Sequence, residues 1–238
     1  FFGGVLAPFL LVLGLTATGA GTASLLLNLE AVLTAALAWV VFKEHADRRI
    51  VAGMALIVAG GVALSWPSGE TAANNLSGAM AIIGACLCWA IDNNLTRKVS
   101  ASDALFIAGA KGLVAGVVNL GLALGLGHAL PALPLAGATM LVGLLCYGLS
   151  LVFFVRALRE LGTSRTGAYF SVAPFFGAIL AIILLGEPLT LPLLGAGLLM
   201  AIGVWLHLSE HHEHQHRHSA LEHTHEHVHG DIDLHHAH

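Results

Sequence analysis

Charged side chains are scarce in this sequence, and their scarcity excludes a soluble globular domain. Asp, Glu, Lys and Arg make up 10% of the 238 residues and hydrophobic residues 57%, with a mean hydropathy of +0.83. A soluble domain of this length needs more charge to cover its surface. Several apolar runs reach the roughly 20 residues that a helix needs to cross a bilayer, and they lack the alternating pattern of a membrane β-barrel. The sequence therefore predicts an all-α polytopic membrane protein.

Motifs that carry enzymatic chemistry are also missing. The sequence contains no Gly-rich phosphate loop, no Ser/His/Asp arrangement and no zincin helix motif. We therefore expect no enzyme activity, no required cofactor and no nucleic-acid partner. Without a Walker motif, an ATP-driven pump is excluded within this chain, so energy would come from an ion or substrate gradient. Cys86, Cys88 and Cys146 lie within apolar runs, which favours free thiols over disulfides.

Eight apolar segments are predicted to be transmembrane helices. The segments between them are charged, polar or proline-containing, as loops are. The chain opens without Met in the middle of apolar sequence, so we expect a fragment whose first span is cut short. The predicted spans are Phe2–Leu15, Ala20–Phe42, Ile50–Trp66, Leu76–Leu95, Ala104–Leu126, Leu135–Val155, Thr166–Leu185 and Leu191–Leu208.

Lys and Arg separate cleanly between the two sides of this predicted bundle. If the loop with Lys43, Arg48 and Arg49 faces the cytoplasm, alternation places every basic residue there except Lys111, which lies within a span. The loops on the opposite side contain no Lys or Arg, and the C-terminal tail is predicted to be cytoplasmic. Those opposite loops are Thr16–Gly19, Pro67–Asn75, Gly127–Pro134 and Gly186–Thr190.

The sequence also repeats itself. Residues Leu15–Leu64 align without a gap with Leu158–His207, and the alignment pairs Glu44 with Glu187. The predicted topology puts these two glutamates on opposite sides of the membrane, so the copies are inverted relative to each other. Inverted repeats are characteristic of secondary transporters. Further matched pairs are Gly19/Gly162, Ala35/Ala178, Leu56/Leu199 and Gly60/Gly203.

Two stretches carry a family resemblance. TASLLLNLEAVLTAALAWVVFKEH (Thr22–His45) and TGAYFSVAPFFGAILAIILLGEPLT (Thr166–Thr190) are each followed by a glycine-rich helix, VAGMALIVAGGVAL and LLGAGLLMAIGVWL. In these features the chain resembles the EamA-type family of the drug/metabolite transporter superfamily, over essentially all of Phe1–Leu208. One departure is Ala31, since the second copy has Pro174 at the matching position.

The resemblance implies an inverted-repeat helical bundle of ten helices, of which this chain would hold about eight. Residues 1–66 would be the end of the first repeat, 76–208 the second, and 209–238 a His-rich, disordered cytoplasmic tail. Membership implies transport, often export, of small organic solutes across a bilayer, which we expect to be the bacterial inner membrane. It does not identify the solute. It is also compatible with a homodimer.

Three ionisable side chains lie inside predicted spans, where charge is costly. In one interpretation Glu30, Asp92 and Lys111 form a substrate or proton pathway, in which Lys111 binds an anionic group and Glu30 takes up a coupling proton. In the alternative, Asp92 and Lys111 form an ion pair that locks neighbouring helices, or Asp92 reaches the interface near Arg97.

Other polar side chains within spans are predicted to line the same pathway, unless they only hydrogen-bond one helix to another. Pro174 is predicted to kink or open its helix and free a carbonyl for the cavity. Gly112 and Gly116 predict close helix packing. The predicted pathway residues are Glu30, Asn28, Lys111, Asp92, Asn93, Tyr147, Tyr169, Ser171 and Pro174.

The tail after Leu208 has a different composition. Alternating His-x-His spacing on a flexible chain suits Zn, Ni, Co or Cu, with Glu213, Glu222 and Glu226 as oxygen donors. Three functions remain open: an organic-solute carrier with a metal-responsive tail, a transition-metal efflux carrier, and a non-transporting metal sensor. The first is preferred because the spans hold no paired metal ligands. The predicted metal ligands are His211, His212, His214, His216, His218, His223, His225, His227, His229, His235, His236 and His238.

Overall fold

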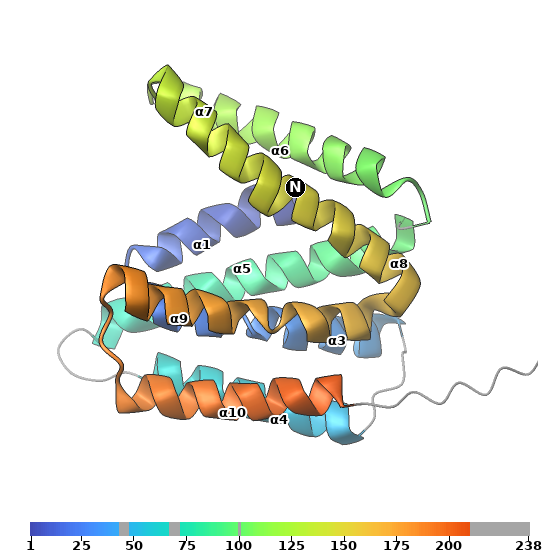
Figure 1. Ribbon diagram of the computed structural model, residues 1–238, viewed down its shortest axis with the longest axis vertical. Helices are drawn as coiled ribbons and strands as arrows, with labels where there is room; N and C mark the ends of the chain where they lie inside the picture. The colour runs from blue at the N-terminus through green and yellow to red at the C-terminus, as the bar shows by residue number, and fades with distance from the viewer. Residues whose placement is uncertain (43–47, 67–71, 100, 210–238) are drawn as a thin grey trace, which may run out of the picture.

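The computed structural model describes residues 1–42, 48–66, 72–99 and 101–209, and all regular structure in these ranges is helical. Figure 1 shows the helices packed with their axes roughly along one direction, in stacked layers. The elements in chain order are η1 (Phe2–Leu6, π-helical), α1 (Ala7–Leu15), α2 (Ala20–Leu26), α3 (Leu29–Phe42), α4 (Arg48–Ser65), α5 (Ala72–Val99), α6 (Ala104–Gly125), α7 (Leu133–Val142), η2 (Gly143–Gly148, π-helical), α8 (Leu149–Phe170), α9 (Ala173–Leu185) and α10 (Leu191–Leu208).

The helices confirm the prediction of a polytopic membrane protein. Five helical stretches are long and apolar enough to cross a membrane, and shorter apolar helices coincide with the remaining predicted spans. Large hydrophobic side chains such as Leu133, Leu191 and Phe106 are more than two-thirds exposed. Such exposure suits lipid and not water. The five long stretches are Ala20–Val41, Arg48–Ser65, Leu76–Val99, Ala104–Gly125 and Leu133–Leu161.

The segment between Val155 and Thr166 separates two spans as predicted, but it is helical and not a loop. Helix α8 continues through it to Phe170 and turns back within it, since the rings of Phe154 and Phe170 meet 5.3 Å apart. The segment contains three Arg, two Leu, one Ala and one Glu, which are good helix formers, and no proline. Its charges mark where the apolar run ends, whereas the helical hydrogen bonds continue. Helix α5 likewise begins at Ala72, inside the predicted loop Pro67–Asn75.

Helix α4 and its matched segment α10 pack against each other. The alignment also makes the contact of α2 with α9 equivalent to the contact of the end of α8 with α3, and both contacts are present. In Figure 1 α4 starts at the right-hand side of the bundle and runs to the left, whereas α10 runs from left to right. The two copies are therefore inverted, as the alignment predicts.

Glycines at equivalent positions make the contact between α4 and α10 reciprocal. A Cβ on Gly60 would lie 2.8 Å from Met200 Cγ and 3.0 Å from the Ala196 carbonyl oxygen. A Cβ on Gly203 would lie 2.6 Å from the Gly53 carbonyl oxygen and 2.8 Å from Ile57 Cγ1. The repeat offset that pairs Gly60 with Gly203 also pairs Gly53 with Ala196 and Ile57 with Met200. The two helices therefore contact each other through equivalent residues.

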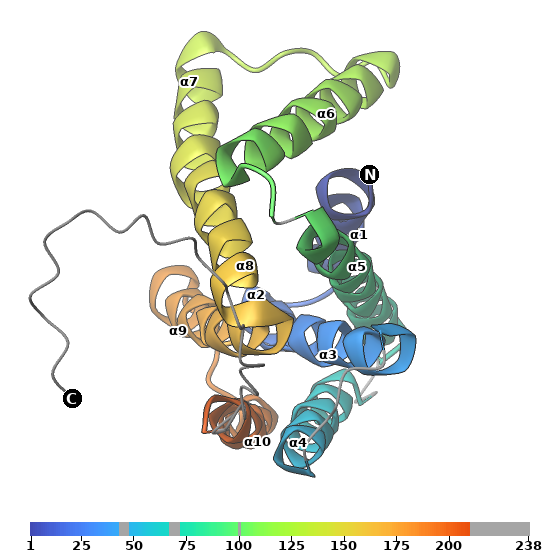
Figure 2. The same cartoon turned by 90° about the vertical axis from the view of Figure 1, so that its right-hand side faces the viewer.

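The buried core joins α2, α3, α4, α5, α9 and α10, with Leu26, Ile57, Ile82 and Met200 at its centre. Helices α6 and α7 lie outside this core and diverge from each other, as Figure 2 shows, and α6 packs against α8 and η1. The prediction of close packing at Gly112 and Gly116 is not met in this structure, since a Cβ on either would meet nothing within 4 Å. Glycines that permit close packing lie in other helices, among them Gly60 and Gly203 between α4 and α10, and Gly14 and Gly78 between α1 and α5.

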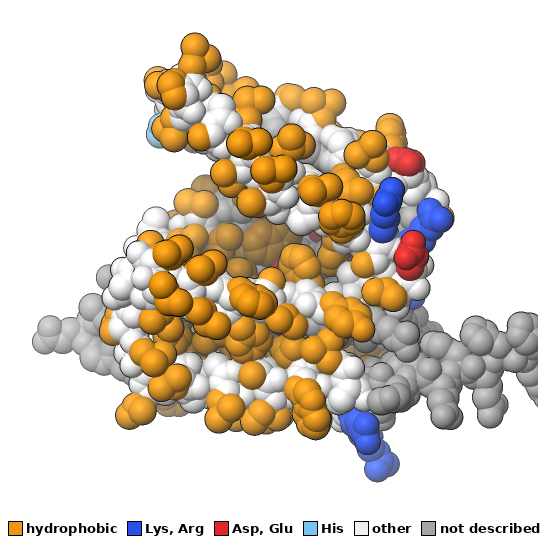
Figure 3. All heavy atoms as spheres, viewed as in Figure 1, with side chains coloured by type: hydrophobic (Ala, Val, Ile, Leu, Met, Phe, Trp, Pro, Cys, Tyr) orange, Lys and Arg blue, Asp and Glu red, His pale blue; other side chains and the backbone are white. Residues whose placement is uncertain are grey.

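Charged side chains gather at one end of the helices. In Figure 3 the visible Lys, Arg, Asp and Glu lie at the side where α10 ends, and the rest of that face is mostly hydrophobic. Asp103 lies at this end as the N-cap of α6, where its side chain accepts a hydrogen bond from the Phe106 N–H at 2.7 Å. The distribution agrees with the division between charged and uncharged loops in the sequence.

Candidate functional site

Both copies of the repeat contain a broken helix. The first break separates α2 from α3 at residues 27–28, and the second separates α8 from α9 at residues 171–172. Under the repeat alignment the two breaks coincide to within one residue. Paired breaks of this kind expose backbone groups in the middle of a membrane, which is tolerated where they line a cavity.

Equivalent polar side chains donate hydrogen bonds to carbonyl groups beside the breaks. The Asn28 amide Nδ2 donates to the Leu25 carbonyl at 3.1 Å, and the Ser171 hydroxyl donates to the Gly167 carbonyl at 2.8 Å. Asn28 and Ser171 are matched by the repeat. Asn28 is fully buried and is not among the residues that line the cavity described below. Its contacts support a structural role at the break and not the predicted place on the pathway.

A hydrogen bond ties the two breaks together. The Ser24 hydroxyl, on α2, donates to the Pro174 carbonyl at 2.8 Å. Pro174 lies in the first turn of α9, where its missing N–H leaves no helical bond unmade. The expectation that Pro174 opens its helix agrees with this position. The first break forms with Ala31 in place of a proline, so proline is not what the break requires.

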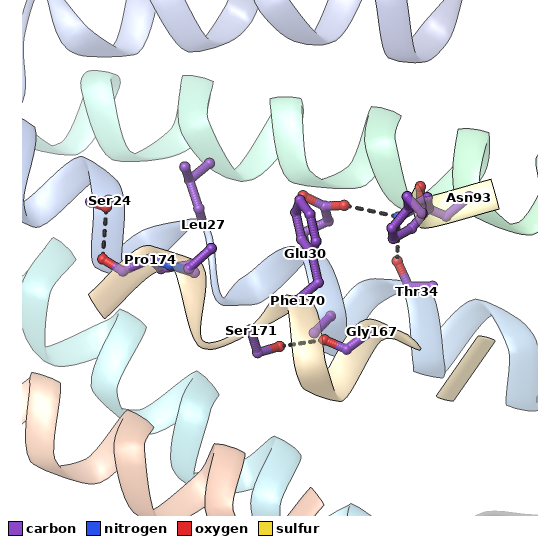
Figure 4. Close-up of a pocket in the computed structure, with 12 residues that line it drawn as sticks. Ser24, Leu27, Glu30, Thr34, Asn93, Gly167, Phe170, Ser171 and Pro174 are labelled. Carbon is purple, nitrogen blue, oxygen red and sulfur yellow. Dashed lines mark hydrogen bonds between the residues drawn. The ribbon is translucent and has the colours of Figure 1, made fainter. Parts of the chain in front are cut away.

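A cavity of about 180 Å³ lies between the two breaks. Figure 4 shows side chains from α2, α3, α5 and the α8–α9 segment pointing into the same region. Because both copies of the repeat contribute to its wall, the cavity lies at the interface about which inverted halves move in transporters. The lining residues are Ser24, Leu27, Glu30, Ala31, Thr34, Asn93, Phe154, Gly167, Phe170, Ser171, Ala173 and Pro174.

Glu30 is the charged side chain of this cavity. Its Oε1 accepts a hydrogen bond from Asn93 Nδ2 at 2.8 Å, and Asn93 also donates to Thr34 Oγ1 at 3.4 Å (Figure 4). Within the described part of the chain, Glu30 has no ion-pair partner. The cavity therefore holds a carboxylate oriented by an amide, with one oxygen left for a ligand.

Aromatic rings form the wall contributed by α8. Phe154 and Phe170 pack edge to face, with ring centroids 5.3 Å apart and an interplanar angle of 68°. Both line the cavity with Glu30. An edge-to-face pair directs the face of one ring at the edge of the other and leaves further ring surface for a ligand.

Lys111 and Asp92 lie elsewhere and form an ion pair. Lys111 Nζ lies 2.5 Å from Asp92 Oδ2 and donates to Thr96 Oγ1 at 2.8 Å. This geometry matches the alternative in which the pair links α5 to α6. The pair lines a separate pocket of about 760 Å³ that Tyr147 and the first residue, Phe1, also line.

The structure thus brings only part of the predicted pathway together. Tyr169, which is 62% exposed, lines a third pocket with Phe154. Sequence reasoning missed Ser24, Thr34 and the two phenylalanines. Thr34 follows Glu30 by one helical turn and could have been found from that spacing, whereas the rings come from a distant helix. The predicted residues that line the central cavity are Glu30, Asn93, Ser171 and Pro174.

Glu187 closes the end of the bundle opposite the charges. Its carboxylate accepts hydrogen bonds from the backbone N–H groups of Ala20 at 2.5 Å and Gly21 at 2.8 Å, at the start of α2. The left-handed conformation of Gly186 (φ +67°) ends α9 and turns the chain toward α2. A carboxylate at a helix N-terminus is favoured by the helix dipole, so Glu187 of one copy caps a helix of the other.

The described residues contain no group of three or more His, Cys, Asp or Glu side chains arranged to hold a metal ion. The predicted metal ligands, from His211 to His238, lie outside the described residues.

An inverted pair of broken helices around a central cavity, inside a lipid-facing helical bundle, defines the class of membrane transporter proteins. Residues 1–66 and 76–209 match the EamA-like transporter family, and the chain belongs to that family, whose members are transporters and not enzymes. It is 34% identical, over 208 residues, to an uncharacterized transporter of Methanothermobacter thermautotrophicus, a match that covers 85% of this chain. The chain spans 60% of the length of that relative. No solved structure matches the chain.

Proposed function

We propose that the protein is a secondary-active exporter of a small organic solute, which binds in the cavity around Glu30. The observation that carries this proposal is the position of the cavity between two equivalent helix breaks, one from each inverted copy. Relative movement of the two copies would open the cavity to one side of the membrane and then to the other.

The contacts between the copies suit such a movement. On one side of the cavity, α4 and α10 form a glycine-mediated contact that can act as a pivot. At the end away from the charges, the Glu187 hydrogen bonds to α2 hold the copies together. Opening that end requires these bonds to break, whereas the pivot can stay packed.

We further propose that the ion gradient that drives export is a proton gradient and that Glu30 carries the proton. Glu30 is suited to this role because it lies on the cavity and lacks a basic partner among the described residues. The polar and ionisable neighbours on α5 are Asn93, which holds one oxygen, and the preceding Asp92, which is neutralised by Lys111.

For orientation, we propose that the charged end and the tail face the cytoplasm of a bacterial inner membrane, following the distribution of Lys and Arg.

We also propose that the first and second EamA repeats are residues 1–66 and 76–208. The tail 209–238 would bind Zn, Ni, Co or Cu through its histidines. Whether the transporter works as a homodimer is a separate question that crosslinking would answer.

Transport by the full-length protein in proteoliposomes loaded with a metabolite mixture tests the function. Ala31→Trp fills the cavity with a large ring, and we expect solute loss from the vesicles to fall at least tenfold. Leu120→Trp, on the exposed face of α6, is the matched control and should transport normally. Wild-type vesicles that retain every solute as well as protein-free vesicles do would refute the proposal.

Transition-metal efflux is the second candidate, because the tail is rich in histidine. Cell metal content under zinc, nickel or cobalt load separates the two. Lower content that persists after truncation at Ser209 and is abolished by Ala31→Trp would make the metal the substrate. Content that follows only the tail would assign the tail to buffering or sensing.

A further inference from the structure

The central cavity offers hydrogen-bond acceptors and few free donors. Ser24 donates its hydroxyl proton to Pro174 and Ser171 donates to Gly167, so both present only their oxygen lone pairs to a ligand. The two amide protons of Asn93 go to Glu30 and Thr34. Among the lining side chains, Thr34 keeps the one hydroxyl proton for which no acceptor is defined.

The charge of the lining residues also favours a ligand that donates hydrogen bonds. Glu30 is the one ionisable residue among those that line the cavity, and no described basic side chain pairs with it. A carboxylate in a site of low dielectric is most stable beside a positive charge. The Asp92 carboxylate, by contrast, already has Lys111 beside it, so it does not call for a ligand.

The aromatic wall adds a second feature that favours a cation. The faces of Phe154 and Phe170 carry negative electrostatic potential, which attracts ammonium groups. A carboxylate and aromatic rings around one space are complementary to an ammonium group, which has several donors and no acceptor. The volume of about 180 Å³ is below the range of roughly 300–1,000 Å³ typical of sites for drug-sized ligands.

We propose that the solute is a small organic monocation with an ammonium group, which binds between the Glu30 carboxylate and the rings of Phe154 and Phe170. The inference rests on the proposed transport function and specifies its substrate class. Anionic solutes and amino-acid zwitterions are disfavoured, because the lining residues provide no basic group for a carboxylate.

Matched ligands test this class. Full-length protein in detergent would be unfolded thermally in the presence of 2-phenylethylamine, 2-phenylethanol or phenylalanine, and of a panel of primary and quaternary amines of similar or smaller size. We expect at least one amine to bind at least tenfold more tightly than its alcohol and its α-carboxylate analogue. Glu30→Gln should remove this preference and Glu30→Asp should keep it. Glu160→Gln, an exposed change of the same chemistry on α8, is the control.

Proteoliposome efflux of the same compounds, mixed with neutral and acidic metabolites, separates the two proposals. Preferential loss of amines that depends on Glu30 supports the substrate class. Transport of neutral or acidic solutes without any amine overturns the substrate class and leaves the transporter function standing. Retention of every solute by folded, reconstituted protein overturns both, as does a panel in which no amine binds and nothing is transported.

Discussion

The two segments that match the transporter family share a backbone plan but differ in the charges they place inside the membrane. In the first, Glu30 lies on the cavity without a basic partner among the described residues. The repeat alignment pairs Glu30 with Ala173, which carries no polar group. In the second, Asp92 and Lys111 neutralise each other away from the cavity. One segment therefore holds an available charge and the other a satisfied pair.

This comparison shows which features of the cavity are common to both copies of the repeat and which belong to one copy. Both copies break their helix at equivalent places, to within one residue, and have a polar side chain there, Asn28 or Ser171, that donates to a carbonyl of the preceding turn. The side chains that give the cavity its chemistry are not repeated, since Thr34 is paired with Gly177 as Glu30 is with Ala173. An inverted duplication can thus build a symmetric cavity whose ligand contacts are asymmetric.

Replacing Lys111 by Met would leave Asp92 as an unpaired carboxylate, so that the second segment would also hold an available charge. We expect a loss of about 2 kcal/mol in the free energy of unfolding, because removing one partner of a partly buried pair leaves the other charge uncompensated. The double variant Lys111→Met with Asp92→Asn should recover most of the loss, as measured by thermal unfolding in detergent. Unchanged stability together with abolished transport would instead assign Lys111 to solute binding.

Alanine substitution of Gly60 and of Gly203 would show whether the two sides of the α4–α10 contact tolerate a methyl group equally. Gly203→Ala brings a methyl group to 2.6 Å from the Gly53 carbonyl oxygen, a backbone atom that cannot rotate away. At Gly60 the nearest atom belongs to the flexible side chain of Met200. We expect Gly203→Ala to cost about 2 kcal/mol and Gly60→Ala about half as much.

The control for these variants is Gly116→Ala, which meets nothing within 4 Å and should be neutral or slightly stabilising. Equal losses at Gly60 and Gly203 would show that the α4–α10 contact relaxes as a unit, and no loss at either would remove its proposed role as a pivot.

The Glu187 cap provides a smaller effect. Glu187→Gln removes the charge from two hydrogen bonds to the start of α2 and keeps a carbonyl that can accept only part of them. We expect a loss of about 1 kcal/mol, as for other helix caps. The end of the bundle at Glu187 should also open more often, which a fluorescent maleimide on a cysteine at Thr18, in a Cys146→Ser background, would report as faster labelling. Labelling at the wild-type rate would show that the cap does not restrain that end.

The spans and the inversion could be predicted from the sequence, because apolar run length, the distribution of Lys and Arg and the repeat offset are all linear properties. The family was predicted separately, from the resemblance of Thr22–His45 and Thr166–Thr190 to its members. The sequence also predicted Glu30, Asn93, Ser171 and Pro174 as pathway residues, and these line the cavity. It could not place Phe154 beside Phe170, because that contact depends on how α8 turns. It predicted a loop where α8 continues, since a gap in hydropathy does not require a gap in hydrogen bonding.

Pro174→Ala should have the smallest effect and addresses the origin of the breaks. The first copy breaks its helix with Ala31 at the equivalent position, so the second break should survive when the proline is removed. Ser24 bonds to the carbonyl of residue 174, which alanine also provides. We expect the free energy of unfolding to change by less than about 1 kcal/mol and transport to continue. A large stabilisation with loss of transport would mean that α8 and α9 had merged into one helix. In that case the polar side chain at the break would be insufficient without proline, and the first copy, which has Asn28, would differ from the second in how its break is maintained.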